Sequence, residues 1–216
     1  MIIQITQTSS NIQQQYQISG SNFLYSGDLG KFSKRQVISL RNNRTELNAV
    51  YKLPSVINFI PFRPLFNKEC IRRQFLLYRN QEPYGRIAFS RHGIYKNYYI
   101  ISLDTGMKLL CYSYAEGSFD YVSIYHGDKQ IAQIETFLNV VDYKYTHQLF
   151  VLDEYSYLVD SLTLWVLYYA NYRFVKRFHM SKTHSFRYAR SLSKYKNKYD
   201  PTWRKTRFPD EDNKTD

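Results

Sequence analysis

Short apolar and β-branched runs alternate with turn residues over residues 2–152. Runs of this length bounded by Gly, Pro, Asn and Asp are typical of β-strands. The connections between most of them are short, which favours antiparallel neighbours, because parallel strands need long crossovers. The pattern predicts about twelve strands, at residues 2–6, 14–18, 23–25, 36–40, 47–53, 71–78, 84–89, 95–103, 107–114, 119–126, 129–137 and 143–151.

Turn residues mark the ends of several runs. Gly127 and Gly117 predict tight hairpin turns, and Gly106 ends a short loop in which a positive φ is available. Pro83 is expected to close a turn after Asn80. The three prolines at residues 54–64 predict a loop or a sheet edge.

The pattern changes after residue 152. A stretch without Gly or Pro predicts a helix over residues 153–172, with Asp153 and Glu154 as caps in its first turn. From Leu162 onward its apolar residues point in every direction, so the helix must be buried on all sides. We therefore expect Leu164 and Trp165 both to be buried.

Two arrangements can bury such a helix. In the first, the fold is mainly β, and an antiparallel closed barrel of about twelve strands surrounds a central hydrophobic C-terminal helix. In the second, the helix lies on a curved sheet and a second subunit covers its free flank. Many predicted strands are apolar or aromatic on both faces, which favours the barrel.

The 216 residues fit one domain with a tail. We predict a barrel domain over residues 1–174 and a basic, partly disordered tail over residues 175–216, so a chain cut after Met180 should still fold. The longest apolar stretch, residues 158–170, falls short of the roughly 20 residues that span a bilayer. The start of the chain does not resemble a signal peptide. We expect a cytoplasmic monomer without a transmembrane span, peripheral at the membrane if it binds lipid.

Positive charge is concentrated in the tail. The chain has a net charge of +12, and residues 173–216 hold 13 Lys and Arg against 5 acidic residues. This asymmetry indicates an anionic partner, such as lipid headgroups or nucleic acid, although a solvated tail that keeps the protein in solution would have the same composition. The candidate anion-binding residues of the tail are Lys176, Arg177, Arg187, Arg190, Lys194, Lys196 and Lys198.

Aromatic residues alternate with these cations. Tyr188, Leu192, Tyr195 and Tyr199 have helical spacing and would form one stripe flanked by basic residues. Such a helix suits an anionic membrane surface, and it also suits single-stranded nucleic acid, whose bases stack on aromatic rings. Alternatively, the tail packs its tyrosines on the barrel or is disordered. A second basic patch on the barrel exterior would comprise Arg72, Arg73, Arg79, Arg86, Arg91 and Lys96.

The sequence offers little for catalysis. The five histidines lack metal-ligand spacing, and Cys70 and Cys111 lie in strand-like runs without a CxxC pair. Nucleotide-binding and nucleophile motifs are also missing from the sequence. We expect a protein that is not an enzyme and has no metal site and no cofactor.

Four segments carry a resemblance to a known family. They are YQISG at residues 16–20, YVSIYHGDKQIAQIE at 121–135, YKYTHQLFVLDEY at 143–155 and LTLWVLYYA at 162–170. Together they resemble the bacterial tubby C-terminal-domain-like proteins, which are related in fold to LURP-one-related proteins, tubby and phospholipid scramblases. The resemblance implies a twelve-stranded barrel around a central hydrophobic helix. Tubby binds phosphoinositide headgroups through basic surface residues, but these cannot be matched to positions here.

Three functional hypotheses follow. The first is a non-catalytic binding module for anionic lipid or a membrane surface, which uses basic and aromatic residues. The second is a nucleic-acid-binding accessory protein that uses the basic tail. The third, implied by the resemblance to scramblases, is a lipid-handling protein, and the lack of a membrane-spanning helix speaks against it.

Overall fold

The computed structural model describes residues 1–9, 14–20, 23–29, 37–52, 70–92, 96–141, 144–173, 184–185 and 195–209. The strands are β1 (Ile2–Ser9), β2 (Gln14–Gly20), β3 (Phe23–Leu29), β4 (Val37–Arg41), β5 (Glu46–Lys52), β6 (Cys70–Arg79), β7 (Glu82–His92), β8 (Lys96–Leu103), β9 (Lys108–Glu116), β10 (Phe119–His126), β11 (Lys129–Val141), β12 (Lys144–Val151) and β13 (His184–Ser185). The helices are η3 (Asp153–Leu158), α1 (Val159–Arg173), η4 (Lys196–Lys198) and α2 (Trp203–Arg207).

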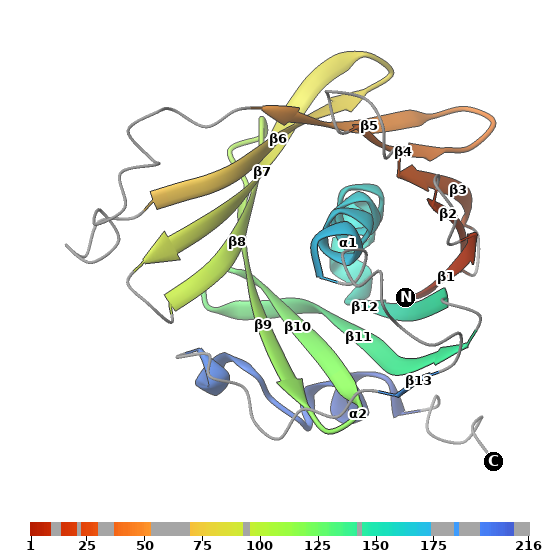
Figure 1. Cartoon of the computed structure of the whole chain (residues 1–216). Coiled ribbons are helices and arrows are strands. Elements are labelled where there is room, and N and C mark those ends of the chain that lie inside the picture. Colours follow the sequence, from red (N-terminus) through yellow and green to blue (C-terminus); the bar gives the residue numbers. More distant parts are fainter. Residues whose placement is uncertain are drawn as a thin grey trace.

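The strands form one antiparallel sheet around α1 (Figure 1). From β1 to β12, each strand pairs with the next strand in the sequence. β1 also pairs with β12, where Ile5 lies opposite His147. The mainly β, antiparallel prediction is therefore confirmed, and each of the twelve predicted runs overlaps one of the strands β1–β12.

The hairpin turns follow the predicted glycines, with one correction. Gly106, Gly117 and Gly127 have φ values of 83°, 57° and 59°, a region that costs glycine little. The β6–β7 turn instead uses Asn80 and Gln81, both at positive φ, as two-residue hairpins require. Pro83 does not close this turn. It lies within β7 opposite Tyr78, beside a register shift that accommodates proline in a strand. Residues 54–64 lie outside the described residues.

The helix begins later than predicted. The 3-10 helix η3 comes first, with a non-helical Tyr155 inside it, and α1 starts at Val159. Asp153 and Glu154 do not act as side-chain caps, because the cap position falls on Leu152. Instead, Asp153 pairs with the Met1 amine and Glu154 pairs with Lys129, long-range contacts that the local pattern does not encode.

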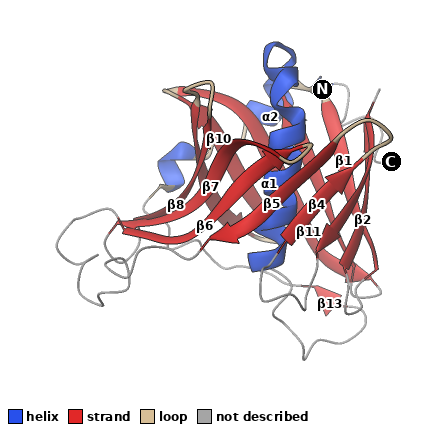
Figure 2. Ribbon diagram, turned by 90° about the horizontal axis from the view of Figure 1, so that it is seen from above, coloured by secondary structure: helices blue, strands red, loops and turns tan. Residues whose placement is uncertain are grey.

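Helix α1 runs alongside the strands (Figure 2). Every residue from 161 to 170 is buried, and the predicted burial of Leu164 and Trp165 is confirmed, since both are fully buried. The sheet approaches the helix closely at Gly27, where a Cβ atom would lie 2.7 Å from Leu167 Cδ1. Glycine at this position lets β3 pack directly on α1.

Polar side chains face the later part of α1. The Tyr169 hydroxyl donates to Asp120 Oδ1 at 2.8 Å. Asp120 lies opposite Thr136, and Thr136 lies opposite His147, so the three form one row across β10, β11 and β12. Thr136 Oγ1 is 2.8 Å from His147 Nδ1. Burial lowers the pKa of His147 to about 3, so the imidazole is neutral in the folded protein.

Candidate functional site

Residues 195–209, here called the strap, pack on the outer face of the sheet, the face turned away from α1 (Figure 1). Tyr195 contacts Tyr112 at a ring-centroid distance of 4.8 Å and Tyr98 at 5.8 Å. The side chains of β8 and β9 therefore hold the beginning of the strap.

Tyr199 lies against two tyrosines of the sheet. Its ring stacks on Tyr114, with centroids 4.8 Å apart, and contacts Tyr121 at 4.7 Å. Burial raises the pKa of Tyr199 far above its ordinary value, and the neighbouring Tyr121 adds to the shift. Between these contacts, the Tyr125 hydroxyl donates to the Lys198 carbonyl oxygen at 3.0 Å. The strap is thus fixed by aromatic packing and a hydrogen bond.

Helix α2 provides the most buried contact of the strap. Trp203 is only 8% exposed, and Phe208 contacts both Trp203 at 5.7 Å and Phe150 of β12 at 5.4 Å. Hydrogen bonds from Thr202 to the Asp200 carboxylate fix the turn that precedes α2, and they hold the pKa of Asp200 below its ordinary value. The order of these residues, an Asp-Pro-Thr turn followed by Trp, is a local signal that the sequence analysis did not use.

A buried polar chain lies beneath the strap. Arg204 Nη1 lies 3.6 Å from Glu135 Oε2, a carboxylate whose side chain is 8% exposed. The Gln133 amide donates to Glu135 Oε1 at 2.9 Å, and the Gln130 amide donates to Gln133 Oε1 at 3.1 Å. Among these hydrogen-bonded side chains, Glu135 is the acidic one. Arg204 neutralises its charge, which would otherwise be costly to bury. The sequence analysis missed both Glu135 and Arg204.

The two sides of the strap differ in chemistry. Tyr195, Tyr199 and Trp203 face the sheet. Lys196, Lys205 and Arg207 are exposed, and Lys198 is half-buried with its ammonium group 5.0 Å from the Tyr125 ring. The strap therefore presents an aromatic side to the sheet and a cationic side to solvent.

The predicted tail residues lie only partly within this strap. Lys176, Arg177, Arg187, Arg190, Lys194, Tyr188 and Leu192 lie outside the described residues. Lys196 and Lys198 belong to the cationic side. Tyr195 and Tyr199 flank η4, and Tyr199 has an extended backbone, so these two do not share a continuous α-helix. Both rings contact tyrosines of the sheet, in line with the alternative in which the tail packs its tyrosines on the domain.

The predicted basic patch is not gathered at one place among its described side chains. Arg79 lies 3.6 Å from Asp160 of α1 and over the Tyr84 ring. Arg73 lies over the Phe89 ring. It precedes Arg79 by six positions in β6, which corresponds to roughly 20 Å along an extended strand. Arg86 is exposed on β7 opposite Leu76. The side chains of Arg72, Arg91 and Lys96 are outside the described part.

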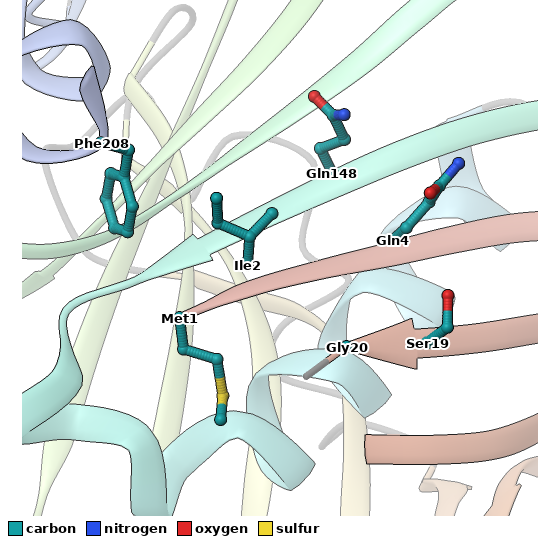
Figure 3. Close-up of a pocket in the computed structure, with 7 residues that line it drawn as sticks. All are labelled: Met1, Ile2, Gln4, Ser19, Gly20, Gln148 and Phe208. Atoms are coloured by element: carbon teal, nitrogen blue, oxygen red, sulfur yellow. The ribbon is translucent and has the colours of Figure 1, made fainter. Parts of the chain in front are cut away.

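A depression lies where the end of the strap meets β12, β1 and β2 (Figure 3). Its volume is about 530 Å³, and its lining is entirely uncharged in the side chains. The lining residues are Met1, Ile2, Gln4, Ser19, Gly20, Gln148 and Phe208. The sequence analysis did not identify this depression, because it depends on pairing between strands at opposite ends of the domain.

Groups typical of metal sites and thiol chemistry are not assembled in the described ranges. Within them, His, Cys, Asp and Glu form no group of three suited to a metal ion. Cys111 is buried, and burial raises the pKa of its thiol well above the ordinary value, so the thiolate is disfavoured. In the same ranges, no helix combines the length and the apolar character needed to cross a bilayer.

No protein-family model matches the sequence, and comparisons with curated proteins and with solved structures gave no match. The resemblance to tubby C-terminal-domain-like proteins therefore stays a prediction.

Proposed function

We propose that the protein is a non-catalytic binding module that associates with anionic lipid surfaces through the cationic side of the strap. The observation that carries this proposal is the division of the strap. The rings of Tyr195 and Tyr199 pack on the sheet. Lys196, Lys205 and Arg207 are exposed. Each cation near an anionic membrane contributes about 1 kcal/mol to binding.

We also propose that the sheet closes into a barrel that supports this strap. Closure is supported by the pairing pattern, since β10 pairs with β11 as well as β9, and β1 pairs with β12 as well as β2. The complete burial of α1 residues such as Leu164 and Trp165 is also expected inside a barrel. A closed sheet would give the strap a rigid platform, with its cations held in fixed positions.

Lipid is favoured over single-stranded nucleic acid by the placement of the tyrosines. Nucleic-acid binding without sequence preference uses aromatic rings on which bases stack. Tyr195 and Tyr199 are engaged with Tyr112, Tyr114 and Tyr121, so these rings are not available to bases while the strap is docked. Exposed cations alone suit a flat anionic surface.

The test is vesicle co-sedimentation with a variant that carries Lys196→Gln, Lys205→Gln and Arg207→Gln. On phosphatidylcholine vesicles that contain phosphatidylserine, we expect binding to weaken roughly 100-fold, because three cations contribute about 3 kcal/mol. Vesicles of phosphatidylcholine alone should bind neither protein. The parent's binding should also fall as salt rises.

The matched control is a second triple variant that also loses three positive charges, at positions distant from the strap. Arg44, Lys52 and Arg86 are exposed on the β4–β7 part of the sheet, which lies across the molecule from α2 (Figure 1). Their change to Gln should weaken binding far less. Equal losses in the two triple variants would overturn the role of the strap. Loss of single-stranded DNA binding in the strap variant, with vesicle binding retained, would favour the nucleic-acid hypothesis.

A further inference from the structure

The outer face formed by β12, β1 and β2 is unusually free of charge. Residues of these strands alternate between buried and accessible positions, and the accessible set faces away from α1. Charged residues make up 22% of the whole chain, yet this set has none between residues 2–6, 15–19 and 146–148. Its members are Ile2, Gln4, Thr6, Gln15, Gln17, Ser19, Thr146 and Gln148.

Strand register aligns these side chains in rows. Gln4 lies opposite Gln148 on one side and opposite Ser19 on the other. Directly opposed residues have Cβ atoms about 5 Å apart, so the row presents three hydrogen-bonding groups at regular intervals. Among the described residues, none of the hydrogen bonds involves the side chains of these three. Thr146, Thr6 and Gln17 form the next row in the same way.

The first row opens into the depression beside the strap. Phe208 lines one end of it and Ile2 lies beside Gln4 (Figure 3). Phe208 is held there by Phe150 and Trp203. The docked strap therefore supplies an aromatic wall to a polar row on the sheet.

The chemistry of this lining points to a neutral polyhydroxyl ligand. A glutamine amide offers both donors and an acceptor, and a serine hydroxyl offers both functions, which matches the adjacent hydroxyls of a sugar. An aromatic ring such as Phe208 can pack against the apolar C–H face of the same sugar ring. The Met1 ammonium group already donates to the Val151 carbonyl oxygen and pairs with Asp153, and the side chains of the lining carry no charge. A phosphate or carboxylate would therefore lose hydration without gaining an unpaired cation. The volume of about 530 Å³ lies within the range of small-ligand sites.

We propose that this depression binds a neutral sugar ring, either free or as the head of a glycolipid. The site is separate from the cations of the proposed lipid-binding surface, so the two proposals can fail independently. On a membrane, a glycolipid sugar would add a selective contact to the electrostatic attraction of the strap.

The test uses the full chain and a Gln4→Ala, Gln148→Ala double variant. Methyl hexosides and disaccharides are titrated and followed by NMR, and phosphatidylcholine vesicles with and without a neutral glycosyl diacylglycerol are tested by co-sedimentation. We expect saturable binding by the parent to at least one of these probes, and at least a tenfold loss in the double variant. Binding of the soluble sugars identifies a free ligand, whereas binding only of the glycolipid vesicles identifies a membrane source.

The control changes two accessible residues of the same strands away from the depression, Thr8→Ala and Gln15→Ala. It should bind as the parent does. The Lys196→Gln, Lys205→Gln, Arg207→Gln variant should also retain sugar binding, which separates this site from the strap cations. The proposal is overturned if neither free sugars nor glycolipid vesicles bind, or if binding survives in a folded Gln4→Ala, Gln148→Ala protein.

Discussion

Helix α1 and the strap pack on opposite faces of one sheet, and both use Trp and Tyr for their contacts. Every residue of α1 from 161 to 170 is buried, and this stretch contains no charged residue. In the strap only Trp203 is buried, and Lys or Arg follows Tyr195 and Trp203 directly. The comparison shows that aromatic content alone does not separate core from surface attachment. The strap differs from α1 in the charged residues that separate its aromatic residues, and Lys196, Lys205 and Arg207 are exposed to solvent.

The strongest test of this difference places a charge inside the sheet. Leu164→Asp would bury an unpaired carboxylate in a fully buried position, and we expect a loss of about 4 kcal/mol or more and loss of the fold. Circular dichroism and thermal melting measure this. Tyr157→Asp is the control, because Tyr157 is 62% exposed on η3, and it should melt as the parent does. A folded Leu164→Asp protein would contradict the burial of Leu164 in the core.

The strap should respond to a comparable change by detaching. Trp203→Ala removes its most buried side chain, and we expect a loss of about 2–3 kcal/mol from burial alone. Limited proteolysis should then cut within the strap while the strands stay protected. A chain cut after Met180 lacks the strap entirely, so its loss of stability is the largest that detachment of the strap can cause. This chain should remain folded. If Trp203→Ala unfolds the whole domain, the strap belongs to the core.

Acid should affect the interior through His147. Its folded pKa is about 3, against an ordinary value of 6.5. Between these values only the unfolded chain binds this proton, so the free energy of unfolding falls as pH falls, by about 2 kcal/mol from pH 6.5 to 5. Denaturant titrations at several pH values give the free energy of unfolding at each pH. In the His147→Leu variant, this free energy should depend less strongly on pH than in the parent.

The ion pair beneath the strap should have the smallest effect. Glu135→Gln keeps the size of the side chain but removes its attraction to Arg204. The change also removes the cost of burying the carboxylate, and Arg204 stays partly accessible to water, so we expect a net loss of only about 1 kcal/mol. Hydrogen exchange of the α2 amides should quicken roughly fivefold, with exchange in α1 unchanged. Glu46→Gln, which removes the partner of Arg41 on the opposite part of the sheet, should not alter α2. Faster exchange in α1 would show that the strap and the interior are coupled.

The sequence predicts the sheet and the helix better than it predicts the sites. Strands and the burial of Leu164 and Trp165 follow from local alternation and from an uninterrupted apolar stretch. The strap depends on contacts such as Tyr199 with Tyr121, which no local pattern encodes. The spacing of Tyr195 and Tyr199 left three interpretations open: a membrane-facing stripe, a surface for stacking bases, and packing on the domain. Both rings contact tyrosines of the sheet.

The depression was also beyond local reasoning. The alternation of Gln4 with buried neighbours is visible in the sequence and indicates only an accessible strand position. Its alignment with Gln148 depends on pairing between β1 and β12. The wall at Phe208 comes from a third distant segment, the strap. A site assembled from three separated parts of the chain requires the tertiary structure.

The pairing of β1 with β12 has a consequence for biosynthesis. Ile3 must wait for Leu149 to leave the ribosome before the two can pair, a delay on the order of 10 s at ordinary translation rates. Helix α1 follows β12, so this buried helix is synthesised after every strand from β1 to β12. During that interval the nascent chain carries an unpaired strand edge beside apolar Ile3 and Ile5, which favours aggregation with other chains. Chaperone demand should therefore be greatest just before α1 emerges.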